Sequence, residues 1–524
     1  MPIRVVNLVV DTKVCENIRR AFAMGVEVVR GKSLTRGAGI LLSISSLPSA
    51  YGIGALGDAA FRFIDLLADL KQKYWQILPM GPLTVGDSPF QSISLFAGNP
   101  YYIDLDDLIR NGLLLAEEVD AYRWGDSEDH VDYGVLYENR YNVLQQAFER
   151  FDIRNASYIA FCEKNREWLE PYSLYMAVKK VNGDRPWFEW EEPIRNRKTE
   201  ALEQYKTDLA GQMAFWNFCQ YEFYQQWESV KAYAHKRGVQ LIGDMPFYVA
   251  YDSVDVWTHR SLFQLDRDGR MLRVAACPPD SFSEKGQIWG NPVYDWEAME
   301  ADNFKWWKAR MKQQASLFDI IKIDHFTGMV KYFSLKNGEK DISRGRWMKG
   351  PGRKLTDVLE KAAGGKIIIA ENMGTMLPGV DMLIRKLGWP DMKVLLFAFD
   401  GKPDNSNLPH NYESTNTVVY AGTHDNDTIV GYFRDYTDYE LAYLYSYLNI
   451  DKKEEISDAL IRTAYASIAD VVILQMQDIL QLGNEARMNQ PSTVGANWKW
   501  RILSAALPEE RRSWIRTQTA LYRR

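Results

Sequence analysis

Cysteines and long apolar runs are scarce in this sequence. The 524 residues include four cysteines, none of which form a CxxC pair: Cys15, Cys162, Cys219 and Cys277. A disulfide framework or a cysteine-based zinc site is therefore not expected, and a reducing, cytoplasmic setting fits. No apolar run approaches the roughly 20 residues of a membrane-spanning helix, so no membrane association is expected.

Positive charge and histidine are also limited. The net charge is −6, and nothing resembles the basic stripe that usually accompanies nucleic-acid binding. The six histidines lack metal-ligand spacing, and no cofactor fingerprint or phosphate cradle is present. We therefore expect no metal, no cofactor and no nucleic-acid partner.

The first 35 residues lack the apolar core and small-residue cleavage site of a secretory signal. Residues 1–35 are interpreted as an N-terminal extension whose status the sequence leaves open, since Met24 is an alternative start.

Eight short, apolar, β-branched runs are the most regular feature of the chain. Continuous apolar runs of this kind are typical of strands buried on both faces, and helical stretches between them favour a parallel α/β barrel. The runs cover residues 39–48, 74–82, 238–247, 318–326, 366–374, 393–400, 417–427 and 471–480.

The spacing of these runs is uneven. About 155 residues separate the second run from the third, far more than one strand–helix unit needs. We predict a single catalytic (β/α)8 barrel of the TIM type over residues 36–524, with large, mostly helical insertions. The inserted subdomains are expected at approximately 100–235 and 249–317.

Four carboxylates follow the predicted strands: Asp244, Asp324, Glu371 and Asp425. Active sites of such barrels lie at the carboxyl ends of the strands. One buried carboxylate there is more often a structural cap or ion pair than a catalyst, but four at one mouth reverse that balance. Glycosidic chemistry, which needs one attacking carboxylate and one protonating carboxylic acid, is the leading interpretation.

Several segments around these carboxylates resemble the amylomaltase family, relatives of the α-amylases. IKIDHFTGM (321–329), IIAENMG (368–374) and GTHDNDT (422–428) are similar to its three catalytic segments, and GDMPFYVAYDSVDVW (243–257) to a fourth. GDSPFQS, GQIWGNP and EARMNQPSTVGANWKWR also match, in order, within residues 36–505. The resemblance implies a TIM-type barrel and a 4-α-glucanotransferase.

The resemblance also implies roles for individual residues. Asp324 matches the nucleophile, Glu371 the general acid/base, and Asp425 the third carboxylate, which favours the distorted transition state. His424 matches a hydroxyl-binding histidine and Asp244 a supporting carboxylate. The remaining expected substrate-binding residues are Lys322, Gln287, Trp289, Asn291, Tyr51, Asp87, Ser88 and Gln91, whereas Asn497, Trp498 and Trp500 are expected to be structural.

Four positions depart from the family pattern. Lys322 stands where arginine is usual, and either cation could lower the pKa of Asp324 and keep it ionised. Thr327 replaces a frequent arginine, Asn372 a common aspartate, and Ser281 a frequent aromatic residue of a covering loop. The three catalytic carboxylates are nevertheless all present.

The implied partners are maltodextrins, starch- or glycogen-type α-glucans, and glucose as an acceptor. The implied reaction moves a segment of α-1,4-glucan to the 4-hydroxyl of an acceptor by retaining double displacement. A mainly hydrolytic α-glucanase and a non-catalytic glucan-binding protein remain as alternatives.

Overall fold

The computed structural model describes residues 34–524 except 85, 281, 374–376 and 378. Eight parallel strands form one sheet in the order β10-β11-β12-β1-β2-β3-β6-β9, and the amide of Ala370 donates to the carbonyl of Pro390 at 3.3 Å where its two ends meet. Each strand lies within or overlaps one predicted run, so the (β/α)8 prediction is confirmed. The strands are β1 (Gly37–Leu41), β2 (Tyr74–Ile77), β3 (Gln240–Met245), β6 (Ile320–Ile323), β9 (Ile367–Ala370), β10 (Asp391–Val394), β11 (Thr417–Tyr420) and β12 (Val471–Gln475).

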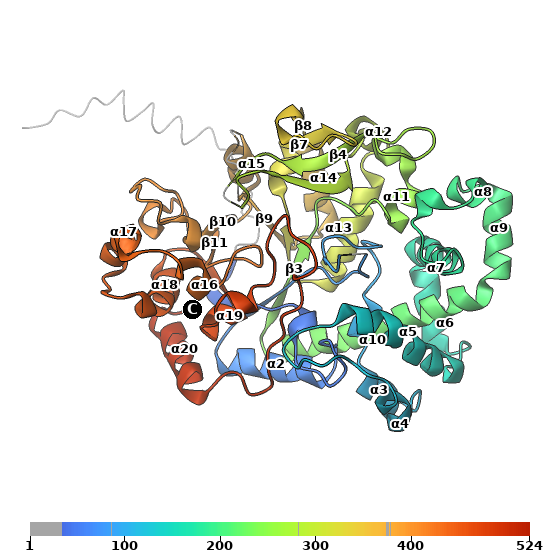
Figure 1. Ribbon diagram of the computed structural model, residues 1–524, viewed down its shortest axis with the longest axis horizontal. Coiled ribbons are helices and arrows are strands. Elements are labelled where there is room, and N and C mark those ends of the chain that lie inside the picture. The colour runs from blue at the N-terminus through green and yellow to red at the C-terminus, as the bar shows by residue number, and fades with distance from the viewer. Residues whose placement is uncertain (1–33, 85, 281, 374–376, 378) are drawn as a thin grey trace, which may run out of the picture.

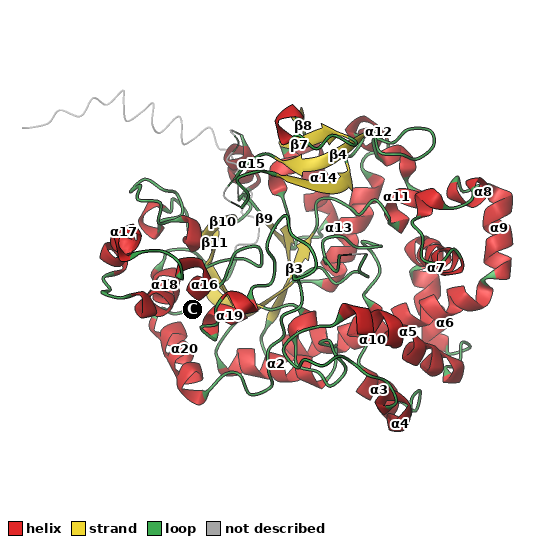
Figure 2. Ribbon diagram, viewed as in Figure 1, coloured by secondary structure: helices red, strands yellow, loops and turns green. Residues whose placement is uncertain are grey.

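Helices pack around this sheet, as Figures 1 and 2 show. In α2 (Asp58–Asp69), the buried residues Ala60, Phe63, Ile64 and Leu67 recur at helical spacing, which places one apolar stripe against the barrel. Two more helices, α10 (Ala210–Lys236) and α13 (Lys305–Leu317), lie within the ranges expected to be insertions but contact barrel strand β3. The helices outside both ranges are α14 (Arg353–Ala362), α15 (Val380–Leu387), α16 (Ile429–Phe433), α17 (Asp438–Leu448), α18 (Ile456–Ala466), α19 (Met476–Ile479) and α20 (Glu509–Leu521).

A helical segment lies between β2 and β3, within the first range expected to be an insertion. Arg140, fully buried, donates to the carbonyls of Tyr101 and Ile103 and so attaches this segment to the loop that follows β2. Its helices are α3 (Leu105–Arg110), α4 (Ala116–Asp120), α5 (Tyr133–Arg150), α6 (Ala156–Lys164), α7 (Arg166–Val181), α8 (Glu192–Arg195) and α9 (Thr199–Asp208).

A second, four-stranded antiparallel sheet was not expected from the sequence. Its order is β5-β4-β7-β8, and it joins two strands from the 249–317 range to two that follow β6. The range 249–317 also holds α11 (Val254–Thr258) and α12 (Trp296–Ala301). The strands are β4 (Arg273–Cys277), β5 (Gln287–Pro292), β7 (Lys331–Lys336) and β8 (Arg346–Lys349).

The N-terminal extension and the absence of membrane spans were both expected from the sequence. Of the N-terminal extension predicted at 1–35, residues 1–33 lie outside the described residues. Among the residues that are described, no helix has both the length and the apolar composition needed to cross a membrane.

Gly243 allows β3 to pass close to the aromatic ring of Phe318, and this contact is testable. A Cβ at position 243 would lie 2.2 Å from that ring. We expect Gly243→Ala to lower the free energy of unfolding by about 1–3 kcal/mol through overpacking, seen as a lower urea midpoint. Gly211→Ala in α10 is the matched control, because no atom lies within 4 Å of its added Cβ. An unchanged midpoint for Gly243→Ala would show that the ring moves away freely.

Candidate active site

Four charged side chains meet where β3, β6 and β9 end. Asp244 and Lys322 are register partners on neighbouring parallel strands, so both side chains point to the same face of the sheet. The Lys322 ammonium lies 2.7 Å from Asp244 Oδ2 and is also paired with Glu371. One carboxylate oxygen from each of Asp244, Asp324 and Glu371 lies within 4.8 Å of the other two.

This carboxylate cluster already contains a cation. The Lys322 side chain is 1% exposed, and its ammonium contacts two of the three carboxylates. A divalent ion held by the same oxygens would have to displace that ammonium. The electrostatic balance of the cluster therefore comes from the chain itself.

The close packing of these groups shifts their protonation. Burial, and next the negative charge of Glu371, raise the pKa of Asp324 well above its usual range, although Lys322 acts in the opposite direction. The expectation that Lys322 lowers this pKa is therefore met only for its own contribution. The pKa of Lys322 is raised well above its usual range: burial opposes this, and the charges of Asp244, Glu371 and Asp324 outweigh burial.

The third carboxylate, Asp425, follows β11 and is hydrogen-bonded by residues of the segment after β12. Asn489 donates its side-chain amide to Asp425 Oδ1 at 2.6 Å, and Arg487 donates to the Asp425 carbonyl at 3.0 Å. His424 Nε2 lies 3.4 Å from the same Oδ1, and its ring stacks on Phe90 with centroids 4.9 Å apart. Asp425 is therefore fixed from a segment some 60 residues further along the chain.

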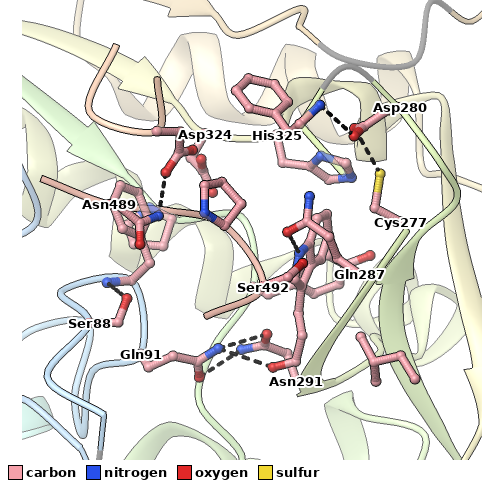
Figure 3. Close-up of a pocket in the computed structure, with 18 of the residues that line it drawn as sticks. Ser88, Gln91, Cys277, Asp280, Gln287, Asn291, Asp324, His325, Asn489 and Ser492 are labelled. Carbon is pink, nitrogen blue, oxygen red and sulfur yellow. Dashed lines mark hydrogen bonds between the residues drawn. The ribbon is translucent and has the colours of Figure 1, made fainter. Parts of the chain in front are cut away.

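A cavity of about 520 Å³ opens above the carboxylates. Its lining includes most of the residues expected from the sequence, namely Asp324, Glu371, Asp425, His424, Gln287, Trp289, Asn291, Ser88 and Gln91. Figure 3 shows how Asp324, Asn489, His325, Asp280 and Gln287 surround it. Lys322 and Asp244 are buried beneath the carboxylates that form the floor of the cavity.

Two expected substrate-binding residues do not line this cavity, although Asp87 stands between the lining residues Gly86 and Ser88. Tyr51 and Asp87 are not part of the cavity lining. The Tyr51 hydroxyl donates to Asp106, which turns it toward the helical insertion. Asp87 takes a left-handed φ of 62°, and burial raises its pKa while the charge of Lys499 lowers it.

Gln91 and Asn291 line the cavity but are engaged with each other. Gln91 Nε2 donates to Asn291 Oδ1 at 3.0 Å, and Asn291 Nδ2 donates back to Gln91 Oε1 at 3.1 Å (Figure 3). This reciprocal pair joins the loop after β2 to β5. Trp289 packs edge-on against His325, with ring centroids 4.9 Å apart, and so forms part of the wall.

Sequence reasoning missed several residues of the lining. Trp498, expected to be structural, lines the cavity and lies 5.8 Å, centroid to centroid, from the His424 ring. Asn497 makes hydrogen bonds to the backbone of Gln490 and Thr493, and Trp500 is buried, in keeping with structural roles. The other missed residues include Tyr248, Asp280, Phe282, His325, Trp347 and Asn489, several of which lie inside the motifs quoted above.

The family departures have definite surroundings. Thr327 is buried at the cavity wall, and Asn372 donates to Asp381 Oδ1 at 2.6 Å at the start of α15. Ser281 lies outside the described residues.

His325, directly after Asp324, has a left-handed φ of 47°, and burial lowers its pKa to about 4.

Two carboxylates this close at the strand ends of a parallel barrel match the spacing in retaining enzymes that act on glycosidic bonds, because inverting enzymes separate the pair by about 6.5–9.5 Å. A sequence profile described as 4-alpha-glucanotransferase matches residues 42–506, and the chain belongs to that family.

Known relatives cover nearly the whole chain. The 4-alpha-glucanotransferase of Clostridium butyricum is 43% identical over 92% of this chain and 100% of its own length. That of Thermus thermophilus is 42% identical over 91% of this chain and 97% of its own. The amylomaltase from Streptococcus agalactiae, solved in complex with acarbose, superposes with a TM-score of 0.90 at 38% identity, covering 93% of this chain and 99% of that one.

The raised pKa of Asp324 implies that ionised Asp324 destabilises the fold. Below the unfolded-state pKa of about 3.9 the carboxyl is protonated in both states, and stability falls as the pH rises from there through the folded-state pKa. We expect Asp324→Asn to melt a few degrees higher than wild type at pH 7, with the difference shrinking toward pH 4. Asp404→Asn, at an exposed position, is the control; a constant difference across this range would contradict the assignment.

Lys322→Arg tests the departure from the family pattern. A guanidinium fork can contact several carboxylate oxygens at once, so we expect the pKa of Asp324 to fall and the acid limb of kcat/KM to move to lower pH. Lys322→Met should move that limb upward and cost about 3–5 kcal/mol of stability, because it leaves buried carboxylates unpaired. Identical pH profiles for the wild type, Lys322→Arg and Lys322→Met would show that this cation does not act on Asp324.

Proposed function

We propose that this chain is a 4-α-glucanotransferase that moves a segment of α-1,4-glucan to the 4-hydroxyl of an acceptor. Maltodextrins and starch- or glycogen-type α-glucans are the donors, and glucose or a maltodextrin is the acceptor. The observation that carries the proposal is the proximity of Asp324 and Glu371, whose nearest oxygens lie within 4.8 Å at the floor of a cavity large enough for sugar residues.

The first half of the reaction forms a covalent intermediate. A carboxylate oxygen of Asp324 attacks the anomeric carbon as the glycosidic bond breaks, and Glu371 protonates the leaving oxygen. The segment on the far side of the bond then departs with a new 4-hydroxyl. The ion pair between Lys322 and Glu371 holds the Glu371 side chain toward Asp324.

The second half reverses these steps with a different partner. Glu371, now ionised, removes the proton from the acceptor 4-hydroxyl, whose oxygen attacks the anomeric carbon and releases Asp324. Two inversions give retention. Asp425, held by Asn489, would accept hydrogen bonds from hydroxyl groups of the sugar at the reacting carbon, with His424 as its neighbour.

Transfer rather than hydrolysis follows from what reaches the intermediate first. The wall contains the rings of Phe90, Tyr248, Phe282, Trp289, Trp347 and Trp498. Aromatic faces bind the apolar C–H faces of sugars and leave little for water to hydrogen-bond, so an acceptor is held where water is disfavoured. We also propose a cytoplasmic setting, on the basis of the few, scattered cysteines.

Incubation of the pure protein with maltotriose tests this proposal. We expect glucose together with a ladder of longer maltodextrins, whereas shorter products alone would indicate hydrolysis and no change a non-catalytic protein. Asp324→Asn and Glu371→Gln should each reduce transfer at least roughly a thousandfold, equivalent to about 4 kcal/mol.

A donor with an activated leaving group separates the two carboxylates. An α-maltosyl fluoride needs no proton on its leaving group, so Glu371→Gln should still release fluoride in a first turnover, whereas Asp324→Asn should not. Equal fluoride release by both variants would contradict the assigned roles.

A further inference from the structure

Tyrosines are concentrated on one surface outside the cavity. Six of them lie within residues 432–447, and three occur in α17 at intervals of four residues. Residues four apart lie on the same helix face, so Tyr439, Tyr443 and Tyr447 form one line, here called the tyrosine stripe. In Figure 1, α17 lies at the left edge of the molecule, away from the helical insertion.

Packing accounts for one member of the tyrosine stripe and not for the other two. The Tyr447 ring contacts Phe399 and His410, and its hydroxyl lies 3.0 Å from His410 Nδ1. The helix buries Leu441 and Leu444, which lie on its other side. Tyr439 is 91% exposed, and Tyr443 is half-exposed. Neither of these two hydroxyls makes a hydrogen bond within the described part of the chain. An exposed group of large aromatic side chains on one face is typical of a binding surface.

Aromatic rings lie between the tyrosine stripe and the cavity. Tyr447 meets Phe399 with centroids 5.5 Å apart, and Tyr443 lies 6.3 Å from Tyr447. Phe399 follows Phe397 by two residues, and Phe397 meets Phe282 edge-on at 5.2 Å. Phe282 lines the cavity. Two groups of half-exposed rings therefore lie between the cavity wall and α17: Phe282 with Phe397, and Phe399 with Tyr447 and Tyr443.

We propose that the tyrosine stripe is a second binding surface for α-1,4-glucan, which holds a long chain whose end occupies the cavity. The inference rests on the proposed function. Tyr439 and Tyr443 each offer an apolar face for a sugar ring and a hydroxyl for its polar rim, and tyrosine loses little side-chain entropy when it binds. Binding at two linked places raises the effective concentration of long glucans at the catalytic carboxylates.

The local charge favours a neutral ligand. Asp435, Asp438 and Glu440 flank Tyr439, and they outnumber the two cations nearby. Arg434 is paired with Asp435, and Lys453 donates to the carbonyls of Arg434 and Tyr436. An anionic membrane or a nucleic acid would be repelled there. A neutral glucan carries no charge and meets no such repulsion.

The test compares long and short donors in the Tyr439→Ala/Tyr443→Ala variant. With glucose as acceptor, we expect KM for long linear amylose to rise about tenfold with kcat unchanged, because two stacking contacts are lost. Kinetics with maltotriose should equal those of wild type, since so short a donor is expected to be held within the cavity. Retardation of the protein in a glycogen-containing native gel should decrease in parallel.

Tyr445→Ala is the matched control, because it removes a tyrosine from the same helix whose hydroxyl instead donates to Asp438 at 3.0 Å. If the double variant melts early, Tyr439→Ala alone carries the test, with a smaller shift in the same direction. Wild-type KM for amylose and wild-type gel retardation in the variant would overturn the inference. Failure of the wild type to disproportionate maltotriose would instead refute the proposed function, and the gel comparison would still report on the stripe.

Discussion

The ammonium of Lys322 is the interaction on which the catalytic site depends. Three carboxylates from three strand ends lie within 4.8 Å of one another, a grouping that repels itself unless protons or a cation intervene. Lys322 supplies that cation from β6, between Asp244 on the neighbouring strand and Glu371 at the end of β9. The barrel register makes this possible, since Asp244 and Lys322 are direct cross-strand partners.

The same arrangement makes the ionised form of Asp324 unfavourable. Its pKa is raised because burial and Glu371 together outweigh the attraction of Lys322. In the proposed mechanism Asp324 must be ionised, so its surroundings oppose the protonation state that the reaction needs, and the cost falls on the stability of the fold.

Much of the barrel was predictable because its signal is local. Strands buried on both faces are continuous apolar runs, and Ile320–Ile323 or Ile367–Ala370 need no knowledge of their partners to be identified. The catalytic carboxylates follow from the same runs, because each stands just beyond a strand end.

The second sheet and part of the site could not be predicted in this way. β8 has exposed and half-exposed residues only, and β4 pairs with β7, some 60 residues away, so neither apolar pattern nor proximity identifies them. Asn489 reaches Asp425 across 64 positions, and Trp498 lines the cavity only because its segment folds back over the barrel mouth. Local sequence likewise places Lys322 next to Asp324, whereas the parallel register pairs it with Asp244.

We propose that the residues lining the cavity walls determine whether the reaction ends in transfer or in hydrolysis. In the proposed mechanism, Asp324 and Glu371 perform the same displacement whatever the acceptor is. β5 and β8 contribute Trp289 and Trp347, and the segment after β12 contributes Trp498, so elements outside the eight barrel strands supply most of the aromatic wall. In the proposed mechanism, the barrel supplies Lys322 and the reacting carboxylates, and these segments outside the barrel strands control which hydroxyl group reaches the anomeric carbon.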